Sequence, residues 1–129
     1  MPHLSLEYSA GLEDRTDMKA FMAALHDAML AAKIFPLAGI RIRAFRADHA
    51  LVADRHPEND FCAMTLNVGA GRTQEDLKAA GDMIFAAAQT ALAGPLATTH
   101  FALSLYIREI DPALSWKDTP IHARLSGQS

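Results

Sequence analysis

Proline at the second position is the residue of this chain that could carry out the most unusual chemistry. The chain begins Met1-Pro2-His3, and a small residue after the initiator methionine permits removal of that methionine. Pro2 would then carry a secondary amine that accepts and donates protons, whereas a proline inside a chain has no N–H. Because about 5% of residues are proline, Pro2 alone is also consistent with chance, and its meaning depends on its neighbours in the fold.

Arginines in two segments could bind an anion near that amine. Arg41 and Arg43 alternate with isoleucines, which predicts that both lie on the less apolar face of a strand. Arg72 ends the run Gly69-Ala70-Gly71-Arg72, between an expected strand and an expected helix, where free N–H groups favour anions. The run lacks the Gly-Lys-Ser/Thr of a phosphate loop and the third glycine of a dinucleotide fingerprint. It is also consistent with a tight turn and a solvated arginine.

Other kinds of site have little support in the sequence. The six histidines show no HExxH motif and no paired ligand spacing, so we expect no metal site. A Ser-His-Asp triad would lack a nucleophile-elbow motif. The single cysteine, Cys62, lies in an apolar run, which predicts a buried, reduced thiol in a cytosolic protein.

The hydrophobic pattern predicts two β-α-β units in tandem, offset by roughly 60 residues. Strands are expected at residues 4–8, 40–45, 61–68 and 101–107. Helices with apolar stripes at three-and-four spacing are expected after Thr16 or Asp17 and after Thr73. Residues 47–60 are expected to form a loop, and Gly94-Pro95 to end the second helix.

Such units predict an α+β fold, a four-stranded mixed sheet with two helices on one face, because each crossover is right-handed. The starts of the first two strands share one end of the sheet, so Pro2 and Arg41 are expected at that end. The other face would be too polar for a dry core, which favours self-association. Its expected residues are His3, Ser5, Arg41, Arg43, Thr65, Asn67, Ala102, Ser104 and Tyr106. The tail from Asp111 has no regular period, and its apolar residues Leu114, Trp116 and Ile121 need a surface to cover, for which a neighbouring subunit is a candidate.

Length and composition predict one globular domain spanning residues 1–129. Half of the residues are hydrophobic and the net charge is −3, which argues against disorder and against nucleic acid or an anionic membrane as the main partner. No basic segment precedes an apolar stretch at the amino terminus, so we expect no secretory signal. The uncharged run from Met83 to Ile107 is broken by Gly94-Pro95 and polar residues, so we expect no membrane span.

Several motifs together resemble the tautomerase superfamily and, within it, the 5-carboxymethyl-2-hydroxymuconate isomerase family. They are Met1-Pro2-His3, the run from Ile34 to Arg41, the run from Gly69 to Arg72, and the tail from Pro112 through Trp116-Lys117 to His122. The resemblance covers nearly the whole chain. It implies a cytoplasmic homotrimer without a cofactor, acting on a small multi-carboxylate substrate in bacterial homoprotocatechuate breakdown. It also implies that Pro2 is the catalytic base and that Arg41 and Arg72 bind or polarise the substrate.

These residue types suit the implied reaction. A 2-hydroxymuconate dienol becomes its conjugated ketone by losing a proton from oxygen and gaining one at carbon, which a single proton-shuttling group can do. An α-amine has a pKa of about 7.7–8.0, and desolvation and nearby arginines would lower that pKa. Guanidinium groups bind carboxylates in bidentate fashion, and one near the 2-oxygen would stabilise developing negative charge.

Two other functions fit the same pattern. A keto-enol tautomerase of the phenylpyruvate type would act on a smaller, more aromatic substrate and would need fewer cationic contacts. A non-catalytic ferredoxin-like module for ligand binding shares the order β-α-β-β-α-β but would need neither a processed amino terminus nor these arginines. The sequence leaves open the exact substrate, the individual roles of Arg41 and Arg72, and whether Arg43 takes part.

Overall fold

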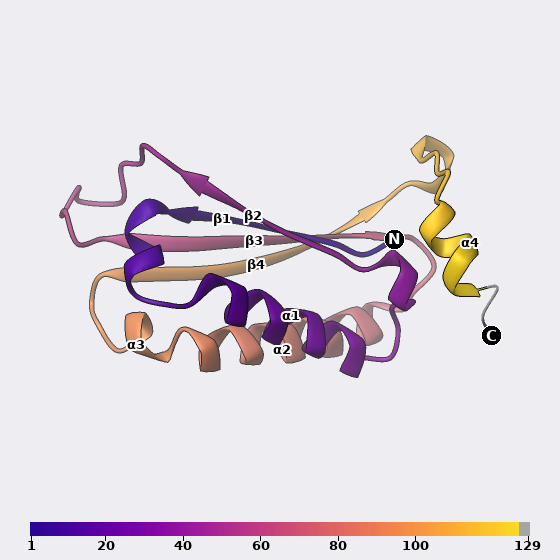
Figure 1. The fold of residues 1–129 in the computed structure, drawn as a ribbon, viewed down its shortest axis with the longest axis horizontal. Coiled ribbons are helices and arrows are strands. Elements are labelled where there is room, and N and C mark those ends of the chain that lie inside the picture. Colours follow the sequence, from indigo (N-terminus) through magenta and orange to yellow (C-terminus); the bar gives the residue numbers. More distant parts are fainter. Residues whose placement is uncertain (127–129) are drawn as a thin grey trace.

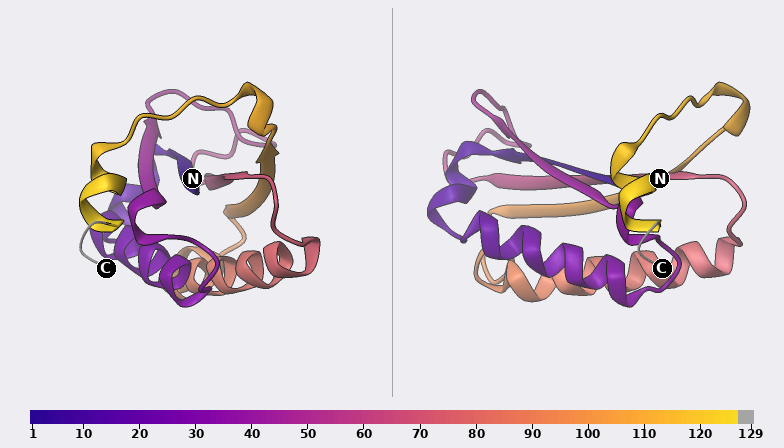
Figure 2. Two further views of the ribbon diagram at one scale, coloured as in Figure 1. Left: turned by 90° about the vertical axis from the view of Figure 1, so that its right-hand side faces the viewer. Right: turned by 45° about the vertical axis from the view of Figure 1, so that its right-hand side comes forward.

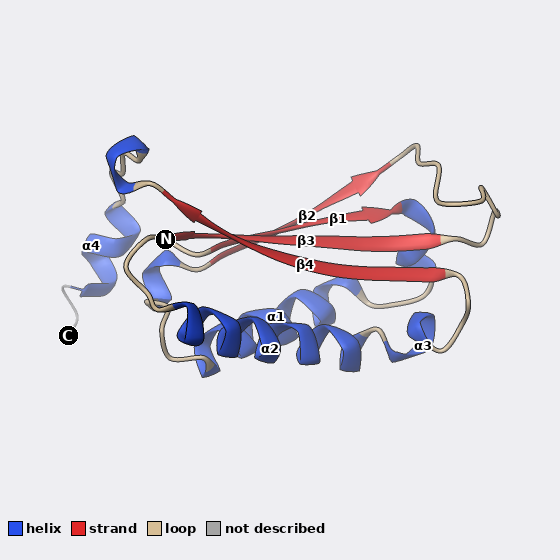
Figure 3. Ribbon diagram, turned by 180° about the vertical axis from the view of Figure 1, so that it is seen from behind, coloured by secondary structure: helices blue, strands red, loops and turns tan. Residues whose placement is uncertain are grey.

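A twisted sheet with helices on one face forms the body of the chain in the computed structural model, which describes residues 1–126 (Figures 1 and 3). Its strands are β1 (His3–Ser9), β2 (Arg41–Ala47), β3 (Asp60–Gly69) and β4 (Phe101–Ile110), in the order β2-β1-β3-β4. β1 pairs parallel with β2 and antiparallel with β3, and β3 pairs parallel with β4. The predicted mixed sheet built from two β-α-β units is therefore confirmed.

Two long helices cover one face of this sheet. α1 (Met18–Ala31) and α2 (Gln74–Ala91) lie side by side beneath it (Figure 2). Asp17 begins α1, because its side chain accepts hydrogen bonds from the first turn of the helix. Thr73 begins α2 in the same way by accepting from the backbone N–H of Asp76. None of the helices within residues 1–126 is long and apolar enough to cross a bilayer.

Short helical segments lie between the main elements and after β4. They are η1 (Ala10–Asp14), η2 (Leu37–Gly39), α3 (Ala93–Leu96), η3 (Pro112–Leu114) and α4 (Pro120–Ser126). Gly94-Pro95 was expected to end the second helix, and α2 does end at Ala91, but the chain turns at once into α3. A proline is tolerated there because the first turn of a helix has no internal acceptors for its N–H groups.

The tail contains regular structure that the sequence pattern did not predict. Pro120 begins α4, which contacts the η2 turn, and Ile121 and Leu125 lie one helical turn apart. A helix of seven residues is too short to show a repeating hydrophobic period, so the prediction of an irregular tail was wrong. Trp116 remains 85% exposed in the single chain.

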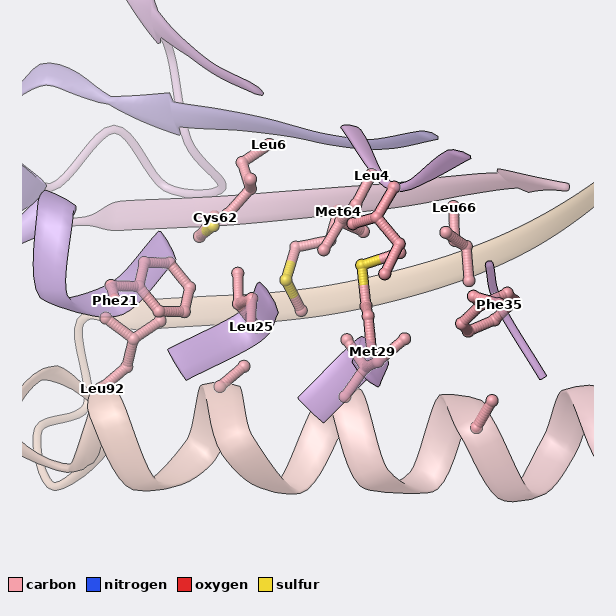
Figure 4. Packing of buried hydrophobic residues seen from close by; sticks show 14 of the residues in the cluster. Leu4, Leu6, Phe21, Leu25, Met29, Phe35, Cys62, Met64, Leu66 and Leu92 are labelled. Carbon is pink, nitrogen blue, oxygen red and sulfur yellow. The ribbon is translucent and has the colours of Figure 1, made fainter. Parts of the chain in front are cut away.

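The hydrophobic core lies between the sheet and the helix pair (Figure 4). Alternate residues of β1 and β3 point into it and meet the buried stripes of both helices. The largest fully buried members are Leu4, Leu6, Leu12, Phe21, Leu25, Met29, Met64, Leu66, Ile84 and Leu92. Cys62 is also fully buried, and burial raises the pKa of its thiol to about 12, so the thiol stays protonated and unreactive.

The opposite face of the sheet carries the polar and cationic residues that alternation predicts. His3 lies opposite Arg41 on one side and Asn67 on the other, and Ser5 lies opposite Arg43 in the same register. No helix within residues 1–126 covers this face (Figure 1). We call it the open face.

Candidate active site at the end of the sheet

Strand order brings Pro2 and Arg41 together. Because β2 lies directly beside β1 and runs parallel to it, the starts of both strands meet at one end of the sheet. The backbone N–H of Arg41 donates a hydrogen bond of 3.1 Å to the carbonyl oxygen of Pro2. The Pro2 ring is fully buried, and a Cβ at position 39 would come within 3.0 Å of its Cδ atom. Gly39 therefore permits the close approach that fixes the proline ring.

The Arg41 side chain is held against the η2 turn. Its Nη1 donates a hydrogen bond of 2.7 Å to the carbonyl oxygen of Ala38 and a longer one of 3.4 Å to that of Ile40. The residue is half-buried and lines the same cleft as Met1. The turn thus orients a guanidinium group beside the amino terminus.

Arg72 approaches the amino terminus from the connection between β3 and α2. Its Nε donates to the carbonyl oxygen of Ile34 at 3.0 Å, and its Nη1 donates to that of Gly69 at 3.4 Å. The guanidinium carbon lies 5.2 Å from the centre of the Phe35 ring, within the range of a cation–π contact. Gly71 has a φ of +116°, a conformation that favours glycine. The glycine-arginine run is therefore a tight turn, and its arginine is anchored rather than freely solvated.

A cleft of about 770 Å³ opens beside the amino terminus. Its walls come from the ends of β1, β2, β3 and β4 and from the tail after β4. The lining includes Met1, His3, Arg41, Asn67, Arg108, Trp116 and Lys117. The tail therefore contributes a wall of the cleft, although Trp116 itself is largely exposed.

Three cations converge electrostatically on the amino-terminal amine. The pKa of the Met1 amine is lowered first by burial and then by Lys117, Arg72 and Arg41. In this structure Met1 precedes Pro2, so the Pro2 nitrogen belongs to a peptide bond and is no base. If Pro2 were the first residue, its amine would lie one residue along the chain from the present position of the Met1 amine. The same cations would then act on it.

His3 lies beside this cluster on the open face. Its pKa is lowered mainly by burial, with further contributions from Arg43 and Arg41. Its Nε2 is buried and has no hydrogen-bond partner among residues 1–126. His3 lines the cleft, and its Nε2 is a buried polar atom that the described residues of the single chain do not satisfy.

The three predicted site residues thus occupy one end of the sheet. Arg43 lies further along β2, is exposed, and acts on His3 rather than on the amine. The sequence pattern includes Lys117 only as part of the family-like tail motif, and it assigns neither Lys117 nor Arg108 to the site. Topology offers a signal for Arg108, because the end of β4 must lie near the start of β1, whereas nothing in the tail's pattern singles out Lys117.

Comparisons with known proteins agree on one family of relatives. A model of the 5-carboxymethyl-2-hydroxymuconate isomerase family matches residues 2–125. A 5-carboxymethyl-2-hydroxymuconate Delta-isomerase from Escherichia coli is 36% identical over 95% of this chain and 98% of its own. The crystal structure of a 5-carboxymethyl-2-hydroxymuconate isomerase from Deinococcus radiodurans R1 superposes with a TM-score of 0.89 at 37% identity, covering 96% of this chain and 93% of that one. A fused 4-OT protein solved as a symmetric trimer has a TM-score of 0.68 at 19% identity, covering 94% of this chain and 98% of its own, and shares the fold.

Proposed function

Because this chain belongs to the 5-carboxymethyl-2-hydroxymuconate isomerase family and is an isomerase, we propose that it ketonises 5-carboxymethyl-2-hydroxymuconate through the amine of Pro2. The observation that carries this mechanism is the convergence of Arg41, Arg72 and Lys117 on the partly buried amino terminus. Pro2, Arg41 and Arg72 are the residues that we assign to the site.

Removal of Met1 is the step that would make this site competent. It would convert the Pro2 nitrogen from an amide into a secondary amine. It would also clear space, because Met1 lines the cleft and its backbone lies within 4 Å of the Cβ positions of Gly39 and Gly69. The reacting part of the substrate would then occupy the position that Met1 occupies in this structure.

A single group, the Pro2 amine, can carry out both proton transfers of the reaction. The neutral Pro2 nitrogen takes the proton from the 2-hydroxyl group, and the oxygen becomes the 2-keto oxygen. The electrons of the diene shift so that the double bond lies between C3 and C4. The pyrrolidinium then returns its proton to C5, which yields the 2-oxo-3-ene tautomer and the neutral amine.

The cations match the charge of this substrate. The molecule carries a carboxylate at each end of the muconate chain and one on the carboxymethyl group. Arg41 and Arg72 offer planar guanidinium groups, which bind carboxylates in bidentate fashion. An arginine close to the 2-oxygen would also stabilise negative charge that develops there.

We extend the proposal to assembly and setting. The open face and the trimeric assembly of a fused 4-OT protein with this fold support a homotrimer. A buried, free Cys62 agrees with a cytoplasmic setting. The proposed pathway is breakdown of homoprotocatechuate, without a cofactor.

The test follows the absorbance of the dienol with Pro2→Ala, Arg41→Ala and Arg72→Ala, after intact-mass measurement shows whether Met1 is removed. We expect kcat/KM to fall by about 10²-fold or more for Pro2→Ala, in line with the usual contribution of acid–base catalysis. Arg46→Gln is the matched control, because Arg46 lies on the same strand as Arg41 but is exposed and pairs with Glu13 and Asp48 instead.

Two outcomes would contradict the proposal. A fully active preparation that retains Met1 excludes an amine base, and unchanged rates in all three variants exclude the site. Parallel assays with phenylpyruvate show whether the chain prefers the family's substrate or the smaller keto-enol acid. A higher kcat/KM for phenylpyruvate would reject the substrate assignment while leaving the base intact.

A further inference from the structure

A second cluster of polar side chains lies at the opposite end of the sheet from Pro2. His56 and Glu58 belong to the loop between β2 and β3, and His100 directly precedes β4. One potential metal-ligating atom from each of these residues lies within 4.8 Å of the other two. More than forty residues separate His100 from the loop residues in sequence. The three residues therefore form no spacing motif, and the sequence predicts no metal site.

Hydrogen bonds fix which nitrogen of His100 carries the proton. The Asn59 Nδ2 donates to the carbonyl oxygen of Val52 at 3.1 Å and to Asp54 Oδ1 at 2.7 Å. Both partners are acceptors, so the amide orientation is determined and Asn59 Oδ1 must face His100. The contact of 2.9 Å between His100 Nδ1 and that oxygen then requires Nδ1–H as the donor. In a neutral ring the lone pair of His100 is therefore on Nε2.

That lone pair faces a carboxylate. His100 Nε2 lies 3.6 Å from Glu58 Oε2, and a cation between these two acceptors would satisfy both of them. A histidine that donates its other N–H to an amide oxygen while its free nitrogen faces a carboxylate has the arrangement of a metal ligand with its orienting partner. A bound proton on His100 would satisfy the same pair.

His56 supplies the third donor. Its ring stacks on that of His100, with centroids 4.1 Å apart and planes 25° from parallel. Its Nδ1 accepts a hydrogen bond of 3.1 Å from the backbone N–H of Glu58, and coordination through Nδ1 would replace this bond. Two imidazoles and a carboxylate form the donor set of open zinc sites, in which water takes the fourth position.

The scaffold around the cluster is already held in place. The backbone N–H of Asp60 donates to the carbonyl oxygen of His100 at 3.0 Å, which ties the loop to the start of β4. Arg15 Nη2 donates to the carbonyl oxygen of Glu58 at 3.0 Å, and its Nε pairs with the buried Asp60. The ligands therefore need small side-chain movements rather than loop refolding.

We propose that His56, Glu58 and His100 bind a divalent transition-metal ion of the zinc type. The ion would clip the loop between β2 and β3 to the start of β4, far from Pro2. Its role is structural, since the cluster shares no residue with the cleft at the amino terminus. Metal binding should stabilise the folded chain without being required for isomerisation.

The experiment measures Zn²⁺ binding to tag-free, chelator-treated protein by competition with a chromogenic chelator, and Co²⁺ binding by visible absorption. We expect a single high-affinity Zn²⁺ per chain, a tetrahedral Co²⁺ spectrum, and a raised melting temperature. Affinity should fall at least about tenfold in His100→Ala and in Glu58→Gln. Glu58→Gln guards against misfolding as an explanation, because the Glu58 side chain is 65% exposed.

His49→Ala is the matched control, because it removes an exposed histidine from the same loop outside the cluster; its Zn²⁺ affinity should equal that of the unchanged chain. The absence of stoichiometric binding would overturn the proposal, and so would binding that survives both His100→Ala and Glu58→Gln. Imidazole ¹⁵N spectra that show a protonated His100 unaffected by added Zn²⁺ would assign the pair to a proton and reject the metal site.

Discussion

Lys117 is the largest electrostatic influence on the amino-terminal amine after burial itself. It lowers the pKa of the Met1 amine by charge and by a side-chain hydrogen bond, and both effects disfavour the protonated form. In the processed enzyme, the Pro2 amine would feel the same cation. Once Met1 is removed, Lys117 would favour the neutral, reactive form of the proposed base.

Replacing Lys117 should shift the pH profile of the reaction. In Lys117→Met one positive charge is lost, so the pKa of the amine rises and the acidic limb of kcat/KM moves to higher pH. The measurement is kcat/KM for the dienol between pH 5 and 9. Lys19→Met, which removes an exposed lysine from α1, should leave the limb in place. An unmoved limb in Lys117→Met would show that Lys117 does not act on the base.

His3 makes a second prediction at the scale of the residue. Its pKa in the folded chain lies below the ordinary value of 6.5, so the unfolded chain binds the proton more tightly. The stability that His3 contributes is present above that ordinary pKa and is lost as the pH falls through the lower pKa of the folded state. Acid should thus destabilise the fold partly through His3.

A His3→Gln variant should lose less free energy of unfolding than the unchanged chain between pH 7.5 and 5.5. Urea titrations at several pH values measure this difference. His122→Gln removes an exposed histidine from α4 and should keep the original pH dependence. Parallel loss of stability in His3→Gln and the unchanged chain would refute the assignment.

The two long helices begin at opposite ends of the sheet, so variants at their first residues can separate an effect on stability from an effect on function. Thr73 caps α2 immediately after Arg72, at the end that holds Pro2, and Asp17 caps α1 at the other end. Thr73→Ala and Asp17→Ala should each cost about 1 kcal/mol of stability. Thr73→Ala should also raise KM for the dienol, because fraying the start of α2 loosens Arg72. Thermal melts and Michaelis profiles measure both, and equal KM values in the two variants would contradict the coupling.

The elements that the sequence predicts well are those with long hydrophobic periods. β1, α1 and α2 bury regular stripes, so residues such as Phe21 and Ile84 reveal them without a structure. α4 escapes prediction because it is short and none of its residues is buried. The same reason hides Lys117, whose position depends on how the tail returns across the end of the sheet.

Some of the site residues could likewise be predicted from the sequence and others could not. Arg41 could be placed near Pro2 from the direction of the strands, although only the strand order makes them adjacent. The group of His56, Glu58 and His100 could not be predicted, because it depends on the path of an irregular loop. Long-range proximity through loops leaves no period or fixed spacing in a sequence.

At the scale of the whole molecule, the open face and the proposed active site are one continuous surface. His3, Asn67 and Arg108 lie opposite one another across β1, β3 and β4, and all of them line the cleft. Tyr106, on the same face of β4, is 66% exposed. A neighbouring chain that covers this face would also bury the polar wall of the cleft.

Assembly and activity should therefore fail together. Tyr106→Lys places a charge on the open face, where burial in an interface would desolvate it, so sedimentation should show smaller species than the proposed trimer. Because the side chain is exposed in the single chain, the subunit itself should stay folded. The cleft would then open to water, and kcat/KM should fall with the trimer fraction. Met83→Lys adds the same charge to an exposed position on α2, in the outer layer, and should preserve both. Full activity in a monomeric Tyr106→Lys would show that the site is complete within one chain.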